Sequence, residues 1–373
     1  MRRILTFAIA TLAVTSTAQG QTPARQPDYL VWVASEATDR IALVRFGPTG
    51  ARVEREFTIG LLPTDPDGPH GLAVSPDGRF LFISTAHGQP FGFLWKIEAA
   101  TGKVLGRVEL GYFPATLQLT PDGAFAYVVN FNLHGDMVPS SVSVVETDSM
   151  IEVARVATCT MPHGSRINPQ GTKQYSACMM DDMVVEIDTR TLGVARRFSV
   201  AKGAEQGAEA VAAHTTHDVP RTTHAPSCSP TWAQPSADGA RVYVACNKSN
   251  EILEIDVDRW TLGRRFAAAE GVYNLAVTHD GRLLVATNKR GQSVSIFDLA
   301  AGTEVARVAT RRRIVHGVVV SPDDRYAFVS VEGVGAQPGT VEVIDLRTRT
   351  SVAAVDVGQM AGGIDFWKLE GGR

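Results

Sequence analysis

The chain has 373 residues, a formal net charge of −3 and 44% hydrophobic residues. This nearly balanced charge, with no basic stripe, argues against a nucleic acid partner. The sequence contains no CxxCH haem-attachment motif and no phosphate-binding P-loop, so we expect neither covalent haem nor a bound nucleotide.

Residues 1–20 have the features of a secretory signal peptide. Two arginines precede an apolar run from Ile4 to Val14, and small residues follow it. The run is too short to be a membrane anchor, and no later segment is apolar enough to span a bilayer. We therefore expect a cleaved signal peptide, a linker over 21–28 and a mature protein that is periplasmic or secreted.

The rest of the chain repeats one pattern with a period of about forty residues. Each copy holds a short strand A, a turn of the Pro-Asp-Gly type and a strand B, followed by strands C and D. Four short strands at this period are typical of a β-propeller. We predict an all-β fold over 29–373, a seven-bladed β-propeller with four antiparallel strands per blade. Strand A occurs in full near residues 70, 115, 163, 231, 273 and 316.

The two ends of the chain carry complementary parts of one further unit. The chain begins with strands B, C and D, and a lone strand A occupies 362–367. We expect this C-terminal strand A to pair with the N-terminal strands B–D, which completes the seventh blade and leaves no open edge. The longest connection, 201–229, is expected to be an insertion that carries His214, His217 and His224.

Short tetrads within the repeats resemble a known family. YVVN at 127–130 and YVAC at 243–246 occur alongside repeated SPDG turns. In these features the chain resembles the YVTN-repeat family of seven-bladed propellers over essentially its whole mature length. The resemblance implies the fold. It implies no single activity, because members of the family differ in function.

Unusual side chains are concentrated on one face of the predicted ring, which we call the top. The connections from strand D to strand A and the loops from strand B to strand C both emerge there. The innermost position of strand A carries His70, His163 and His316, and Met161 and Met179 flank His163. Imidazole and thioether ligands together select soft transition metals. The sequence therefore predicts a top-face metal site, with copper as the favoured ion, formed by these five residues.

The four cysteines form two matched pairs on the top face. In each pair one cysteine precedes a strand A and the other ends the following strand B. In an exported protein this arrangement favours two disulfides, Cys159–Cys178 and Cys228–Cys246. The alternative keeps the thiols as soft metal ligands beside the methionines.

A run of basic residues lies close to the third histidine. Arg311, Arg312 and Arg313 precede His316, and Lys289 lies in a neighbouring top loop. This cationic arc could bind an anionic ligand or a partner surface, or it could be ordinary exposed charge.

Three functions are compatible with these features. The first is a periplasmic metal-dependent oxidoreductase that acts on a small molecule at the top face. The second is a non-catalytic binding or scaffold propeller whose partner is a small molecule or a periplasmic protein. The third is a metal-assisted lactonase or lyase, in which Asp65, Asp67 and Asp181 would hold a hard divalent ion.

Overall fold

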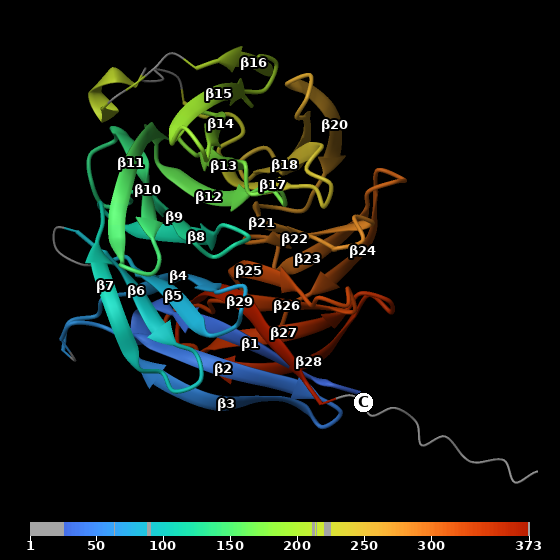
Figure 1. Cartoon of the computed structure of the whole chain (residues 1–373). Coiled ribbons are helices and arrows are strands. Elements are labelled where there is room, and N and C mark those ends of the chain that lie inside the picture. The colour runs from blue at the N-terminus through green and yellow to red at the C-terminus, as the bar shows by residue number, and fades with distance from the viewer. Residues whose placement is uncertain are drawn as a thin grey trace, which may run out of the picture.

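The computed structural model describes residues 26–62, 64–87, 91–210, 213, 215–219 and 225–371. The expected signal peptide lies outside these residues. Seven antiparallel sheets are arranged like the blades of a wheel around one axis (Figure 1). The predicted seven-bladed β-propeller is confirmed.

Blades 1 to 3 follow one another along the chain. Blade 1 contains β4 (Pro69–Val74), β5 (Phe80–Thr85), β6 (Phe93–Glu98) and β7 (Val104–Glu109). Blade 2 contains β8 (Pro114–Leu119), β9 (Phe125–Asn130), β10 (Pro139–Glu146) and β11 (Ile151–Thr160). Blade 3 contains β12 (Pro162–Ile167), β13 (Lys173–Cys178), β14 (Met183–Asp188), β15 (Gly193–Ser199) and β16 (Gln206–Glu209).

Blades 4 to 6 have four strands each. Blade 4 contains β17 (Pro230–Pro235), β18 (Arg241–Cys246), β19 (Glu251–Asp256) and β20 (Thr261–Ala267). Blade 5 contains β21 (Val272–Val277), β22 (Leu283–Asn288), β23 (Ser293–Asp298) and β24 (Thr303–Ala309). Blade 6 contains β25 (Val315–Val320), β26 (Tyr326–Val331), β27 (Gly339–Asp345) and β28 (Thr350–Val357).

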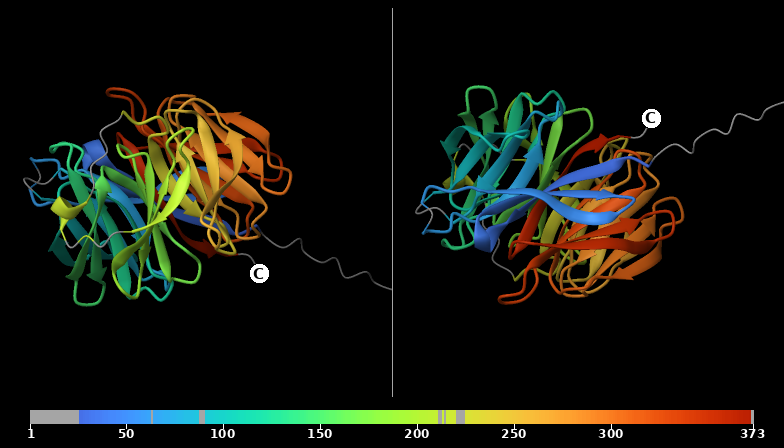
Figure 2. Two further views of the ribbon diagram at one scale, coloured as in Figure 1. Left: turned by 90° about the horizontal axis from the view of Figure 1, so that it is seen from above. Right: turned by 90° about the horizontal axis from the view of Figure 1, so that it is seen from below.

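Blade 7 joins the two ends of the described chain. It contains β29 (Ala361–Glu370), β1 (Asp28–Ser35), β2 (Arg40–Gly47) and β3 (Gly50–Thr58), in that order across the sheet. β29 pairs antiparallel with β1, with Ile364 opposite Val33. Figure 2 shows the blue N-terminal strands beside the red C-terminal strands. The predicted closure is confirmed, although β1 begins at Asp28, the last residue of the expected linker.

The turns from strand A to strand B share one hydrogen-bonding device. In the SPDG turn of blade 1, the Ser75 hydroxyl donates to Asp77, and the same hydroxyl oxygen accepts from the Phe80 amide. Thr120 with Asp122, and Ser236 with Asp238, repeat this pattern. Side chains that bond the backbone a few residues away hold a tight turn closed. The repeated turn therefore fixes the register of each A–B hairpin.

Buried residues of adjacent blades form shared clusters. One cluster combines Leu30 and Trp32 of blade 7 with Leu81, Ile83 and Trp95 of blade 1. Because strand side chains alternate between the two faces of a sheet, each blade packs against both of its neighbours. The core is therefore a ring of interfaces between sheets.

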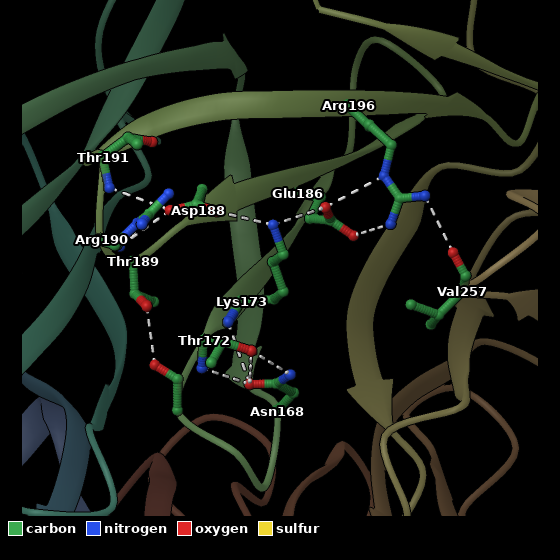
Figure 3. Close-up of polar contacts among 11 residues, drawn as sticks. Asn168, Thr172, Lys173, Glu186, Asp188, Thr189, Arg190, Thr191, Arg196 and Val257 are labelled. Carbon is green, nitrogen blue, oxygen red and sulfur yellow. Dashed lines mark hydrogen bonds and ion pairs between the residues drawn. The ribbon is translucent and has the colours of Figure 1, made fainter.

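Charged side chains also link the outer strands of neighbouring blades. Figure 3 shows Arg196 on β15 paired with Glu186 of β14, which is only 1% exposed. The same guanidinium donates to the Val257 carbonyl of blade 4 at 3.0 Å. Lys173 approaches Glu186 from the other side at 3.5 Å. A buried carboxylate thus joins two blades through one arginine.

The 201–229 insertion is partly ordered as an addition to blade 3. β16 pairs with β15 and makes this sheet five-stranded, and a short 3₁₀ helix covers Thr216–Asp218. His217 lies in that helix, whereas His214 and His224 lie outside the described residues. In the part of the chain that the structure describes, no helix is long and apolar enough to cross a membrane.

Candidate functional site at the top mouth

Two sets of equivalent positions surround the central opening on the top face. The first is the inner position at the start of each strand A. Around the ring it holds Gly362, His70, Ala115, His163, Thr231, Tyr273 and His316. The second is the residue that directly follows each strand B. It holds Glu36, Ala86, Phe131, Met179, Asn247, Lys289 and Glu332. Side chains from the two sets contact one another above the axis.

His70 is held by a carboxylate from blade 7. Its Nδ1 donates to Glu36 Oε2 at 2.6 Å, and His87 Nε2 donates to the other oxygen of the same carboxylate at 2.7 Å. In the neutral imidazole of His70, Nε2 therefore carries the lone pair. This atom is buried and has no hydrogen-bonding partner among the described residues.

His163 is bonded through both of its ring nitrogens. Nδ1 donates to the Thr231 carbonyl at 3.0 Å, so Nε2 accepts the Tyr273 hydroxyl at 2.9 Å. Burial, the charge of His70 and the charge of Lys289 lower the pKa of His163 to about 3. This imidazole is therefore neutral and fixes the orientation of Tyr273.

A cation occupies the opposite side of the mouth. Lys289 Nζ lies 2.9 Å from Glu332 and 4.3 Å from the centre of the Tyr273 ring. Burial lowers the pKa of Lys289, but Tyr273 and Glu332 outweigh that effect and hold it above its usual value. Burial, together with the charge of Lys289, lowers the pKa of His316 well below its usual value. The mouth thus combines a permanent ammonium group with a neutral imidazole.

Glu36 remains ionised in spite of its burial. Burial raises its pKa, but the charge of His70 and the hydrogen bonds from His70 and His87 hold it well below the usual range. The hydrogen bond between His87 and Glu36 in turn raises the pKa of His87. Glu36 is therefore a fixed negative charge that orients His70.

The rings of the three predicted histidines gather at this opening. The centroid of His70 lies 6.2 Å from that of His163 and 5.6 Å from that of His316. A cavity of about 740 Å³ lies above them. Its lining includes all three histidines, Glu36, Tyr273, Lys289, Glu332, Arg313, Phe113, Phe131, Leu133, Met179, Ile314, Val334 and Met360.

The other predicted metal ligands lie in apolar surroundings. Met161 is buried in a cluster with Phe113 and Phe131, and Met179 packs against this cluster while it lines the cavity. The described residues contain no group of three or more His, Cys, Asp or Glu that could hold a metal ion. Since both nitrogens of His163 are bonded, the geometry gives copper no ready set of ligands, and copper binding stays a prediction.

The cysteines form the two predicted disulfides. Cys159 bonds Cys178 and Cys228 bonds Cys246, with Cα atoms 5.9 Å and 4.5 Å apart. The alternative in which free thiols bind a metal is therefore wrong for this structure, because each sulfur is bonded to another sulfur. Both bridges connect strand B with the segment just before strand A.

The predicted cationic arc is divided. Arg312 pairs with Asp356 at 2.5 Å and also bonds Thr340, while the Arg311 amide donates to Glu342. Of the four residues of this arc, Arg313 and Lys289 line the cavity. Among the described residues, the Arg313 side chain has no ion pair, so it is the member of the arc best placed to meet an anionic group.

Of the three carboxylates proposed for a hard metal ion, two accept backbone hydrogen bonds, and the contact of Asp65 is made by its backbone. Asp67 accepts the Leu61 amide at 2.5 Å, and Asp181 accepts the Thr160 amide at 2.7 Å. Asp65 forms an isolated bridge with Leu62. None of the three lines the cavity, so a lactonase at this mouth would use other groups.

Glu36, Tyr273 and Glu332 are the site residues that the sequence analysis did not assign. Tyr273 occupies the same inner position of strand A as the three histidines, and the two glutamates lie just after strand B in blades 7 and 6. The signal that could have found them is positional, because Glu36, Lys289 and Glu332 all follow the last residue of a strand B.

Comparison with known proteins gives the fold alone. No family model and no curated protein matches this sequence, so the YVTN-repeat resemblance stays a prediction. Solved structures do match. Hydrazine synthase from Kuenenia stuttgartiensis is 23% identical, with a TM-score of 0.62 over 82% of this chain and 91% of that one. The periplasmic gluconolactonase of Pseudomonas aeruginosa is 18% identical, with a TM-score of 0.69 over 91% of this chain and 99% of that one. A putative 6-phosphogluconolactonase from Bacteroides fragilis is 15% identical, with a TM-score of 0.66 over 91% and 98%. These structures share the propeller fold of this chain.

Proposed function

We propose that the protein is an exported hydrolase that opens small lactones or related esters by general acid–base catalysis at the top mouth. The observation that carries this proposal is the environment of His70. A buried carboxylate bonds one nitrogen, the other nitrogen is buried without a partner among the described residues, and His70 is one of the residues that line the cavity. A carboxylate that fixes the tautomer of an imidazole produces a general base.

The opposite side of the mouth supplies the electrophilic partner. Lys289 stays protonated beside Glu332, and it lies in the same cavity as His70. A fixed cation stabilises the negative charge that develops on a carbonyl oxygen during attack. His163 contributes indirectly, because it holds Tyr273 under the Lys289 ammonium.

The reaction balances with water as the second substrate. A water oxygen attacks the carbonyl carbon while His70 Nε2 takes one proton from that water. The negative carbonyl oxygen faces Lys289. The bond between the carbonyl carbon and the ring oxygen then breaks, and the leaving oxygen receives the proton from His70. The product is a hydroxy acid, and His70 returns to its neutral state.

Two further observations support the proposal. A cavity of about 740 Å³ lies in the range usual for small-molecule sites. Two of the proteins with this fold are described as lactonases, one of them periplasmic. Export is part of the proposal, and it rests on the N-terminal sequence and on the two disulfides, which are typical of oxidising compartments.

Hydrolysis of a lactone panel by chelator-treated protein tests the proposal. We expect His70→Gln to lower kcat by roughly 10²-fold or more. His279→Gln is the matched control, because His279 is an exposed histidine paired with Asp324 at an A–B turn, away from the mouth. Equal activity of the wild type and His70→Gln would remove the base assignment.

The same preparation distinguishes the other two hypotheses. A stoichiometric copper ion in the untreated protein, with activity that returns only on adding copper, would favour the predicted oxidoreductase. Salt-sensitive binding of a periplasmic protein that is lost in Arg313→Ala but not in His70→Gln would favour the scaffold.

A further inference from the structure

One wall of the top mouth is apolar. Phe113 and Phe131 of blade 2 lie with ring centroids 5.7 Å apart in an edge-to-face arrangement. Leu133 and Met179 extend this surface, and all four side chains line the cavity. We call these four residues the apolar wall. It lies beside two histidines of the mouth, since Phe113 is 5.6 Å from His70 and Phe131 is 4.7 Å from His163 between ring centroids.

The facing wall is polar, and most of its charges are neutralised within the protein. Lys289 pairs with Glu332, and Arg290 pairs with Glu270 at 3.3 Å. These pairs leave little demand for a highly hydroxylated ligand. The apolar wall carries no charge. Phe113 and Phe131 are 4% and 5% exposed and belong to a buried cluster with Met161, whereas Leu133 is 38% exposed beside the cavity.

The backbone around the mouth favours glycine where the chain has large apolar residues. In all seven blades, the residue two positions before the inner position of strand A has a positive φ. Gly68 and Gly271 adopt this conformation in two blades, at φ 63° and 68°. Phe113 and Ile314 adopt it at φ 51° and 67°, which is unfavourable for a residue with a β-carbon and most of all for a β-branched one. Met360 also adopts it and lines the cavity. Apolar side chains are thus present at the rim although glycine suits the backbone better.

We propose that the substrate is a lactone or ester with an apolar alkyl or aryl substituent, and that this substituent lies on the apolar wall while the carbonyl is held between His70 and Lys289. This inference rests on the proposed function. It separates this chain from a sugar lactonase, whose substrate would place hydroxyl groups against phenylalanine and leucine and lose their hydration without compensation.

Binding of non-hydrolysable lactams, measured by calorimetry, tests the inference independently of catalysis. The series carries methyl, propyl, pentyl and heptyl substituents, with gluconolactam as the polar comparison. Each added methylene that becomes buried should tighten binding roughly three- to fourfold. Leu133→Asn should reduce this dependence on chain length. Leu369→Asn is the matched control, because Leu133 and Leu369 are 38% and 40% exposed and Leu369 lies on β29, outside the cavity lining.

The two failures have different signatures. Four outcomes would overturn the proposal of an apolar substituent. These are affinity that does not change with chain length, tighter binding of gluconolactam, no binding of any lactam, and equal effects of the two leucine substitutions. An increase of affinity with chain length in a protein that hydrolyses no lactone would retain the apolar wall as a binding surface and refute the hydrolase.

Discussion

The pairing of His70 with Glu36 shows how one carboxylate gives a common residue a distinct role. Among the inner-ring histidines that the structure describes, only His70 has a carboxylate oxygen within hydrogen-bonding distance of one nitrogen and a second nitrogen without a partner. His316 differs, because its Nε2 lies 3.7 Å from Glu332. His163 has the same side chain, but its nitrogens bond a carbonyl and a phenol. The surroundings of each histidine, and not the residue type, distinguish His70, the proposed general base, from His163, which holds Tyr273 in place.

Replacing Glu36 tests its role as a positioning residue. Glu36→Gln keeps the shape but removes the charge that favours the productive tautomer, so we expect kcat to fall about 10²-fold or more while KM changes little. Asp324→Asn, beside the control His279, should change neither. A fall in KM alone, without a change in kcat, would contradict the assignment.

The buried His163 makes the stability of the folded protein depend on pH. Its folded pKa is lowered to about 3, whereas an unfolded histidine titrates near about 6.5. Between these values the unfolded chain binds a proton that the folded chain does not. Stability is therefore complete above about pH 6.5 and falls as the pH decreases below it. Imidazole NMR should show a neutral His163 at about pH 5, and a protonated ring there would refute the assignment.

At the scale of the strand, the link between blades 3 and 4 depends on Glu186. This carboxylate is 1% exposed, and Arg196 provides its closest ion pair. Arg264 makes the equivalent link from Glu254 to the Leu299 carbonyl between blades 4 and 5. The arrangement recurs because one arginine on an outer strand pairs with a buried carboxylate of its own blade and also bonds a backbone carbonyl of the next blade.

Removal of the arginine should therefore cost more than removal of a surface pair. We expect Arg196→Ala to lower the free energy of unfolding by about 2–3 kcal/mol, because Lys173 at 3.5 Å only partly compensates the buried charge. Arg155→Ala breaks an exposed pair with Glu152 and should cost below about 1 kcal/mol. Urea unfolding of both variants measures the difference, and equal losses would show that the Glu186 charge needs no partner.

The sequence predicts much of the fold because the information is repeated. SPDG-type turns fix six A–B hairpins, and the unmatched strands at the two ends predict the closure. The same register predicts that His70, His163 and His316 share one opening. It does not predict which histidine is the base, because that depends on Glu36, which lies on a 3₁₀ turn (Glu36–Thr38) of another blade. Nor does it show that Met161 is packed by phenylalanines, since that contact joins residues distant in sequence.

For the whole molecule, stability should depend on the pairing of β29 with β1. Deleting 361–370 leaves β1 with an open edge and removes Ile364 from the core, so we expect loss of the cooperative unfolding transition measured by circular dichroism. A circular permutant that joins residue 371 to residue 28 and opens the chain within 133–137 keeps this pairing and should fold. A truncated protein as stable as the permutant would show that the ring needs no closure.

The pairing of β29 with β1 also determines when blade 7 can be completed during translation. The ribosome makes the first three strands of blade 7 before the other six blades and the fourth strand, β29, after them. For nearly the whole of that interval the nascent polypeptide exposes a strand whose partner does not yet exist, which is the kind of edge that promotes aggregation. We expect the unfinished chain to depend on chaperones until β29 has been made and can pair with β1.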